Sequence, residues 1–405
     1  MEQWKEINAT EFCYHITDGT HDSPKAVPEG KFLITSKHIK NDQIDFDSAY
    51  KISEEDYFKI VSRSKVDKWD IIISMIGAYC GFCYLQDNNQ TDFAIKNVGL
   101  FKVGEEYKCK WLYYYLTSPQ VKQQLAMMRS GSSQPYIALN SLRNLKIPCP
   151  SKEIMVAVVS ILDSIDKKIR LNRQINDNLE QQAQALFKSW FVDFEPFKDS
   201  EFVDSELGMI PKGWRVFPIK EIAKFSQGTQ VPIENQYDTC GNNMIRFIRI
   251  VDYTSNNTEP PRYIISDNNQ TYCSADDIVM VRYGNIGKIG RRLSGVIANN
   301  LFKILPIKFI TSNFLYYFFN QDVIQKFIIA SAAGSAMPAI KHSTFGNIYI
   351  AIPPQSIIES FDKLCSSVEE IILKNLKEND SLISLRDTLL PRLMSGELKI
   401  NEINY

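Results

Sequence analysis

Long apolar runs are missing from this sequence of 405 residues. Nowhere do about 18 uncharged apolar residues follow one another, which is the length that a membrane-spanning helix needs. The first residues, MEQWKEINATEF, also lack the basic stretch followed by an apolar stretch that marks a secretory signal. The sequence therefore predicts a cytoplasmic protein with no membrane partner.

Residues that could hold a metal or perform catalysis are few and scattered. The four histidines have no metal-ligand spacing, and of the eight cysteines only Cys80 and Cys83 form a CxxC pair, with no second pair to complete a zinc site. Neither a GxSxG turn nor a GxxxxGK followed by Ser or Thr occurs. We expect reduced thiols, no metal site, no catalytic residues and no cofactor in this chain.

The chain instead contains an internal repeat. Gly131 to Pro135 (GSSQP) recurs as Gly334 to Pro338 (GSAMP), and the same offset of 203 residues carries Asn144 onto Asn347. Further upstream Trp4 corresponds to Trp214 and Gly19-Thr20 to Gly228-Thr229, with loops of different length between them. A duplicated chain is two copies of one structural unit, so each copy is analysed as a domain with its own core.

Each copy ends in a long heptad pattern, which predicts two helices that pair as a coiled coil. If a pseudo-two-fold axis relates the copies, these helices run antiparallel. A polar residue recurs in both seams, where it can fix register. The predicted seam consists of Ile154, Val158, Ile161, Ile165, Asn172, Ile175, Leu179 and Leu186 in the first helix, and Ile357, Phe361, Leu364, Val368, Asn375, Leu382, Leu385 and Leu389 in the second.

The remaining segments are rich in β-branched and aromatic residues broken by Gly, Pro and Asn, which is typical of mixed α/β globules. The expected fold class is α+β: two mixed α/β domains joined by two long antiparallel helices that form a coiled coil in a pseudo-two-fold duplicated chain. We expect the first globule at 1–150, the central helix at 151–197, the second globule at 198–353, and the C-terminal helix and tail at 354–405.

Charge is segregated although the formal net charge is only −1. Residues 107–152 contain basic residues and no acid, and Asp322 is the only acid within 278–358. One basic region in each copy is the footprint of a protein whose two globules each meet a phosphate backbone. The candidate DNA-binding residues are Thr20, Lys37, His38, Arg129, Ser132, Ser133, Gln134, Tyr136, Arg246, Arg249, Arg282, Tyr283, Asn285, Lys288, Arg291, Arg292 and Lys341.

Several short motifs, taken in order, resemble the DNA specificity subunit of type I restriction-modification systems over essentially the whole chain. They are the two glycine loops, the proline-rich starts of both helices, LFKSWFVDF at 186–194, GMIPKGW at 208–214 and LLPRLMSGEL at 389–398. The resemblance implies that the two globules are target recognition domains, each reading one half of a bipartite, asymmetric site on double-stranded DNA. It also implies that the coiled coil sets the spacer between the halves.

The resemblance further implies partners that supply the chemistry. Two modification (methyltransferase) subunits, which bind S-adenosylmethionine and methylate adenine, would dock on the helices. Restriction (translocase and nuclease) subunits, which use ATP and Mg, would join them. The chain itself would be non-catalytic.

Two other classes of function stay open at the level of the residues. The chain could be a single-chain DNA-modifying enzyme, such as a nuclease or methyltransferase fragment, which turnover by the purified chain with cofactor and DNA would support. It could also be a coiled-coil assembly protein without a DNA role, which undetectable DNA affinity in the presence of the modification partner would support.

Overall fold

The computed structural model describes residues 4–40, 43–77, 79–130, 135–254, 259–265, 267, 270–332 and 339–398. The chain divides into two compact units: unit 1 comprises Met1–Arg170 and Asn379–Tyr405, and unit 2 comprises Leu171–Glu378. Each unit contains one globule and one part of each long helix. The division into recognition domains and spacer helices stays a prediction, because the compact units are drawn through the helices.

Unit 1 is built on an antiparallel sheet in the order β2-β10-β7-β8. Its central strand β7 is buried along its whole length, as expected for the apolar run DIIIS. A smaller sheet has the order β6-β3-β9, and β1 pairs with β11. The strands are β1 (Lys5–Asn8), β2 (His15–Asp18), β3 (Lys31–Thr35), β4 (Ile39–Lys40), β5 (Gln43–Ile44), β6 (Lys51–Ile52), β7 (Asp70–Ser74), β8 (Cys83–Gln86), β9 (Ala94–Lys96), β10 (Val98–Lys102) and β11 (Lys146–Cys149).

The helices of unit 1 cover this sheet and supply much of its core. The aromatic segment of α3 contributes Trp111 and Tyr114 to the largest apolar cluster of the unit, so its predicted role as core is confirmed. The short helices before the long one are α1 (Ala9–Phe12), η1 (Ser36–His38), α2 (Glu54–Ser64), α3 (Glu106–Thr117), α4 (Pro119–Met127) and α5 (Leu139–Arg143).

Unit 2 repeats the topology of the main sheet, but its second sheet has four strands where that of unit 1 has three. Its main sheet has the order β15-β22-β19-β20, its second sheet the order β17-β16-β21-β18, and β14 pairs with β23. The strands are β12 (Phe202–Val203), β13 (Ile210–Pro211), β14 (Arg215–Pro218), β15 (Ala223–Gln227), β16 (Met244–Ile248), β17 (Arg262–Ile265), β18 (Tyr272–Cys273), β19 (Ile278–Val281), β20 (Ile289–Gly290), β21 (Gly295–Ile297), β22 (Leu301–Pro306) and β23 (Tyr349–Ile352).

The helices α8, α9 and α10 of unit 2 follow one another as α3, α4 and α5 do in unit 1, whereas α2 of unit 1 has no helical counterpart among the described residues of unit 2. They are η2 (Glu195–Phe197), η3 (Ile219–Glu221), η4 (Ile233–Asn235), α7 (Ile250–Thr254), α8 (Ser312–Phe319), α9 (Asp322–Ala332) and α10 (His342–Gly346). The aromatic helix α8 is buried from Phe314 to Phe319, as α3 is in unit 1. The described residues thus bear out the duplication read from the sequence.

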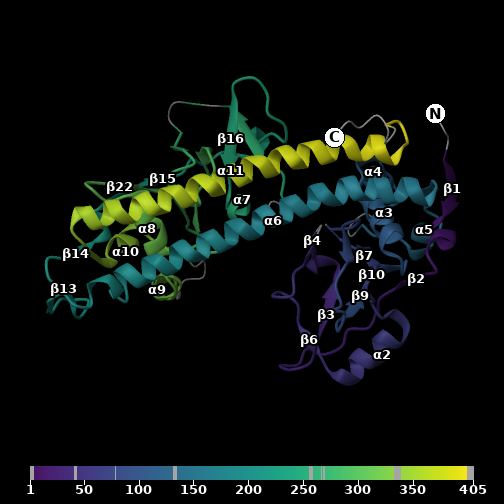
Figure 1. The fold of residues 1–405 in the computed structure, drawn as a ribbon, viewed down its shortest axis with the longest axis horizontal. Helices are drawn as coiled ribbons and strands as arrows, with labels where there is room; N and C mark the ends of the chain where they lie inside the picture. Colours follow the sequence, from purple (N-terminus) through teal and green to yellow (C-terminus); the bar gives the residue numbers. More distant parts are fainter. Residues whose placement is uncertain are drawn as a thin grey trace. The chain divides into compact units, whose positions relative to one another are not determined.

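Two helices of 40 residues each, α6 (Lys152–Phe191) and α11 (Gln355–Met394), begin and end 203 residues apart. Figure 1 shows them side by side within each unit. In unit 1 Asp166 of α6 pairs with Arg386 of α11 at 3.0 Å. In unit 2 Asn172 Nδ2 donates to Glu378 Oε2 and Asn375 Nδ2 donates to Asn176 Oδ1, both at 2.8 Å. Along these contacts the residue numbers of α6 increase while those of α11 decrease, so the helices run antiparallel. The predicted fold class is confirmed.

Thirteen of the 16 predicted seam residues are buried or half-buried. Val158, Ile165, Asn172 and Phe361 are buried. Ile154, Leu179, Leu186, Ile357, Val368, Asn375, Leu382 and Leu389 are half-buried, and Ile161 is buried. The prediction needs correction at the other three, because Ile175, Leu364 and Leu385 are 45%, 49% and 48% exposed.

Next to the exposed Ile175 and Leu364, the buried residues lie one position further along the chain. They recur every seven residues in α6 and, except at the half-buried Arg386, also in α11. They are Met155, Leu162, Ile169, Asn176 and Ala183 in α6, and Ile358, Cys365, Ile372, Asn379 and Leu393 in α11. The predicted positions Ile175, Leu364 and Leu385 therefore flank the seam instead of forming it.

Candidate nucleic-acid interface

In unit 1 a chain of contacts joins loops that lie far apart in the sequence. Ile76 forms an antiparallel bridge with Tyr136, and its N–H donates to Ser36 Oγ at 3.3 Å. Ser36 Oγ donates to the carbonyl oxygen of Asn97 at 2.9 Å, and the Asn97 N–H donates to the carbonyl oxygen of Thr20. The fold thus brings together three of the predicted segments, which contain Thr20, Lys37 and Tyr136.

The side chains on these loops can meet a polyanion. Lys37 is exposed, Thr20 is half-buried and Tyr136 is 45% exposed. A lysine can neutralise phosphate, whereas hydroxyl and aromatic groups can contact sugars and base edges. The arrangement therefore offers one charge and several polar groups on the linked loops.

His21 belongs to the same loops and was missed by the sequence analysis. Its Nδ1 lies 2.9 Å from Asn97 Oδ1 and its Nε2 lies 3.0 Å from Asp18 Oδ2, so the ring is held in place while its side chain stays 67% exposed. Arg63 also donates to Asp18. The signal in the sequence was the position of His21 directly after the repeated Gly-Thr turn.

The Gly-Thr turn has the same geometric cause in both units. Thr20 forms a parallel bridge with Lys96, and Thr229 forms one with Ala298. A Cβ atom at Gly19 or Gly228 would overlap the carbonyl oxygen of the neighbouring strand. Only glycine lets the backbones approach this closely, which explains why the pair recurs.

Two candidates of unit 1 are used inside the globule. His38 is fully buried, and its Nδ1 accepts a hydrogen bond from the Thr35 N–H at 3.0 Å. Burial and the charge of Lys37 lower the pKa of His38. The prediction of a DNA contact at His38 is therefore corrected to a structural role. Arg129 is exposed but donates through Nη2 to the carbonyl oxygen of Cys80 at 2.6 Å.

Three candidates of unit 1, Ser132, Ser133 and Gln134, lie outside the described residues, and so do most of the two glycine loops.

In unit 2 the corresponding loops meet in the same way. Tyr283 bridges Ala339, as Ile76 bridges Tyr136 in unit 1. Asn285, Lys288 and Lys341 are exposed, and Tyr283 is half-buried. The fold thus places one tyrosine, one amide and two lysines on this side of the second globule, which differs in chemistry from the first.

Arg282 holds these loops together. Its Nε donates to the carbonyl oxygen of Ile340 at 3.2 Å, and its Nη1 donates to Gln227 Oε1 at 3.1 Å. Because these donors are engaged within the globule, the structure favours a supporting role for Arg282 over the predicted contact with DNA.

Arg246 and Arg249 share one buried carboxylate. Asp252 is 1% exposed in its side chain, and the two guanidinium groups approach it to 3.1 and 3.2 Å. Arg249 also donates to the carbonyl oxygen of Pro260 at 2.7 Å. A buried carboxylate requires such partners. Both arginines are therefore corrected from free basic residues to internal ion pairs.

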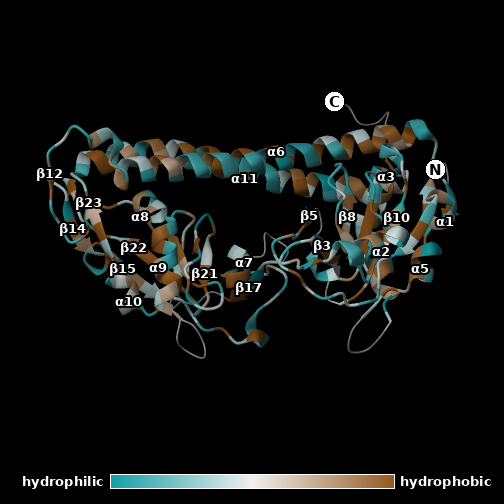
Figure 2. Cartoon of the chain, turned by 90° about the horizontal axis from the view of Figure 1, so that it is seen from below, coloured by the Kyte–Doolittle hydropathy of each residue, from teal (hydrophilic) through white to brown (hydrophobic). Residues whose placement is uncertain are grey.

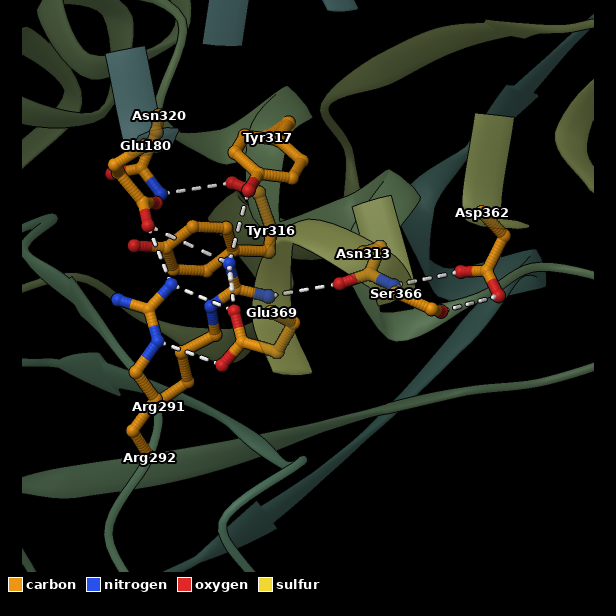
Figure 3. A network of polar contacts seen from close by, with 10 residues as sticks. All are labelled: Glu180, Arg291, Arg292, Asn313, Tyr316, Tyr317, Asn320, Asp362, Ser366 and Glu369. Atoms are coloured by element: carbon orange, nitrogen blue, oxygen red, sulfur yellow. Dashed lines mark hydrogen bonds and ion pairs between the residues drawn. The ribbon is translucent and has the colours of Figure 1, made fainter. Parts of the chain in front are cut away.

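Arg291 and Arg292 are also largely buried, and Figure 3 shows their contacts with Glu180 and Glu369. Arg291 Nη2 lies 2.7 Å from Glu369 Oε2 on α11 and 3.7 Å from Glu180 Oε2 on α6. Arg292 donates to Glu180 and, at 2.7 Å, to both oxygens of Glu369. Because their charges attach the globule to the two helices, the structure favours a supporting role for both residues over the predicted contact with DNA.

Two buried cysteine thiols have raised pKa values. Burial and the charge of Asp70 raise the pKa of Cys13 to about 12, and burial raises that of Cys83 to about 12. These thiols therefore stay protonated near neutral pH.

The residues that the structure describes contain no group of three or more His, Cys, Asp or Glu side chains placed to hold a metal ion. Nor do they include a helix long and apolar enough to cross a membrane.

Comparison with known proteins decides the family. The sequence model described as "Type I restriction modification DNA specificity domain" matches residues 1–181 and 211–390, one stretch in each copy of the repeat. The chain belongs to this family. It is a specificity subunit, and the family's domain serves DNA specificity and not catalysis. The resemblance seen in the sequence is thereby confirmed.

Relatives extend over most of the chain. The MjaIX specificity subunit of Methanocaldococcus jannaschii is 31% identical over 309 residues, which cover 73% of this chain and 70% of the relative. The HindI specificity subunit of Haemophilus influenzae is 25% identical over 470 aligned positions, covering 98% of this chain and all of the relative. A crystal structure of the S subunit from M. genitalium has a TM-score of 0.51 at 17% identity and covers 96% of both chains, which shows a shared fold.

Proposed function

We propose that each globule of this specificity subunit reads one half of a bipartite, asymmetric site on double-stranded DNA. One observation carries the proposal: two globules whose main sheets have the same topology gather loops at equivalent places but present different side chains there. Equal topology gives each globule the same manner of approach to a duplex. Unequal side chains give the two half-sites different sequences.

In the first globule the proposed contacts are Thr20, Lys37, Arg129 and Tyr136, together with Ser132, Ser133 and Gln134. In the second they are Tyr283, Asn285, Lys288 and Lys341. The lysines would neutralise phosphates and position the globule, whereas amide and hydroxyl groups can pair with base edges in the major groove. His21 joins the first set, because its ring is exposed and already held by Asp18 and Asn97.

The helix pair would set the spacer between the half-sites and dock two modification subunits. The support is a row of apolar side chains that flanks the seam and is exposed in this chain, namely Ile175, Leu364, Ile371 and Leu385. Figure 2 shows apolar residues interspersed with polar ones along both helices. Exposed apolar rows rimmed by polar residues mark protein interaction sites.

The chemistry of the complex would come from its partners. The modification subunits would bind S-adenosylmethionine and methylate adenine, and restriction subunits would contribute ATP- and Mg-dependent translocation and cleavage. The assembly would work in the cytoplasm, where its DNA lies.

An exchange of one globule tests the proposal. Replacing residues 1–150 with the corresponding segment of a relative is expected to change the bases recognised in one half-site and to leave the other half and the spacer as they were. The measurement is a map of methylated adenines in DNA exposed to the assembled complex. A change in both half-sites would contradict the assignment of one globule to each half.

A further inference from the structure

Each unit contains a junction at which the globule and both helices meet around one carboxylate. In unit 1 the carboxylate is Asp166 of α6, which accepts a hydrogen bond from the Tyr114 hydroxyl at 2.9 Å and pairs with Arg386 of α11. The 203-residue offset carries Asp166 onto Glu369 and Tyr114 onto Tyr317. These residues therefore occupy equivalent positions of the repeat, although in unit 2 the Tyr317 hydroxyl accepts a hydrogen bond from Arg291 Nη2 at 3.1 Å.

The arginine of the junction has a different source in each unit. In unit 1 it is Arg386, which belongs to a helix, so this ion pair joins helix to helix. In unit 2 the cations are Arg291 and Arg292, which follow strand β20 of the globule. The second globule thus pairs with carboxylates of both helices, Glu180 of α6 and Glu369 of α11, whereas in the first globule Lys110 of α3 pairs with Asp163 of α6.

This attachment is rigid. Arg292 meets both oxygens of Glu369 through two nitrogens, the planar geometry that guanidinium and carboxylate share. Its backbone lies in the left-handed region with φ of 72°, which non-glycine residues rarely adopt unless the surroundings impose it. Arg291 lies with its guanidinium carbon 3.8 Å from the centre of the Tyr316 ring and donates to Asn313 Oδ1 at 2.9 Å. Asn313 in turn donates to Asp362 of α11.

The side chains of Arg291 and Arg292 are only 4% and 18% exposed, so the cluster cannot serve as a surface for phosphates. Two cations and two carboxylates also balance in charge. A buried pair of this kind is poor evidence for extra stability, because desolvation offsets much of the attraction, but it fixes one arrangement of the elements it joins.

We propose that Arg291 and Arg292 are positioning residues that fix the orientation of the second recognition globule on the helix pair and thereby restrict the complex to one DNA spacer length. The inference rests on the proposed function. It concerns geometry and not base recognition: the pair holds the globule to both helices at once, so its loops meet the DNA at one angle.

The test uses the complete chain assembled with its modification subunits and a set of duplexes that contain both half-sites. The spacer in these duplexes is the natural one, or one base pair shorter or longer. Arg292→Gln and Glu369→Gln remove the same ion pair from opposite sides. Each is expected to reduce the preference in methylation rate for the natural spacer by about tenfold, with the recognised bases unchanged. The double variant is expected to lose no more than the single variants.

The controls separate positioning from other roles. Lys326→Gln removes a charge from an exposed position of the same globule and is expected to leave the spacer preference unaltered. Arg292→Lys keeps the charge but loses the planar fork, so it is expected to lie between wild type and Arg292→Gln, and it serves if the stronger variant fails to fold.

Two results would overturn the inference. One is an unchanged spacer preference in both Arg292→Gln and Glu369→Gln. The other is a change of the recognised bases in Arg292→Gln alone, because Arg292 would then read DNA directly. A failure of the proposed function is distinguishable, because the wild-type complex would then show no bipartite site at all.

Discussion

Glu180 shows how single residues attach the second globule to the helices. Burial raises the pKa of its carboxyl, but the charges of Arg292 and Arg291 outweigh this effect and hold the pKa below its ordinary value of 4.5. Arg292 responds in the opposite sense: burial lowers its pKa, yet Glu369 and Glu180 raise it well above the ordinary value. Both shifts favour the charged forms, so the ion pair persists across the neutral range.

The depressed pKa of Glu180 predicts a pH-dependent contribution to stability. A carboxyl whose pKa is lower in the folded state stabilises the fold above its unfolded value and loses this contribution as the pH falls through its folded value. Glu180→Gln is therefore expected to reduce the free energy of unfolding by about 2 kcal/mol at pH 7. The difference from wild type should shrink below pH 4.5, as denaturant titrations at several pH values can measure.

Glu359→Gln is the matched control, because Glu359 is an exposed carboxylate of the same unit. Its effect is expected to stay within about 0.5 kcal/mol at every pH. A penalty for Glu180→Gln that remained constant down to pH 3 would show that the shape of the side chain matters and not its charge.

The residue scale is also where the sequence was least informative. Arg291 and Arg292 stand in the basic region at 278–358, Arg246 and Arg249 lie upstream of it, and all four were predicted to contact DNA. Their acidic partners settle their actual role. Asp252 lies close in the sequence, but Glu180 and Glu369 lie on helices that are distant in the chain, and one sequence gives no measure of that proximity.

At the scale of elements, the two long helices follow directly from the heptad pattern. One of the two heptad positions was predicted correctly, but the other was placed one residue too early, as at Ile175 and Leu364. Apolar residues occupy both flanks in places, as Ile161 and Leu162 do, and the buried flank includes Asn176, Ala183 and Asn379. Hydrophobicity alone therefore favoured the more apolar positions, although Ile175, Leu364 and Leu385 among them are exposed.

That exposed row predicts a loss of assembly without a loss of fold. Leu364→Lys together with Ile371→Lys places charge on side chains that are 49% and 46% exposed, so the folded chain is expected to keep its stability. Binding of a modification subunit is expected to weaken by about 2 kcal/mol or more, the scale of an interface hot spot. Co-purification and titration of the two proteins measure the change.

Ser360→Lys together with Ser367→Lys adds the same two charges to exposed positions of α11 outside the row and should bind as wild type does. Equal binding by the row variant and this control would show that the modification subunits dock elsewhere.

At the scale of the whole molecule, duplication is the feature that the sequence reveals most fully. Elements α4, α5, β11 and α6 begin 203 residues before α9, α10, β23 and α11. This constancy follows from cores that tolerate little change in length, whereas the loops upstream drift because they run over the surface. The offset alone could not reveal that each compact unit takes part of both helices, because that depends on antiparallel pairing.

The most direct test of the central claim, that two globules each read half of one site, is a map of methylated adenines in the genome of cells that contain the intact system. The account predicts a single motif made of two constant blocks of different sequence, separated by a fixed number of variable bases. A continuous motif, or two blocks with no fixed separation, would contradict it.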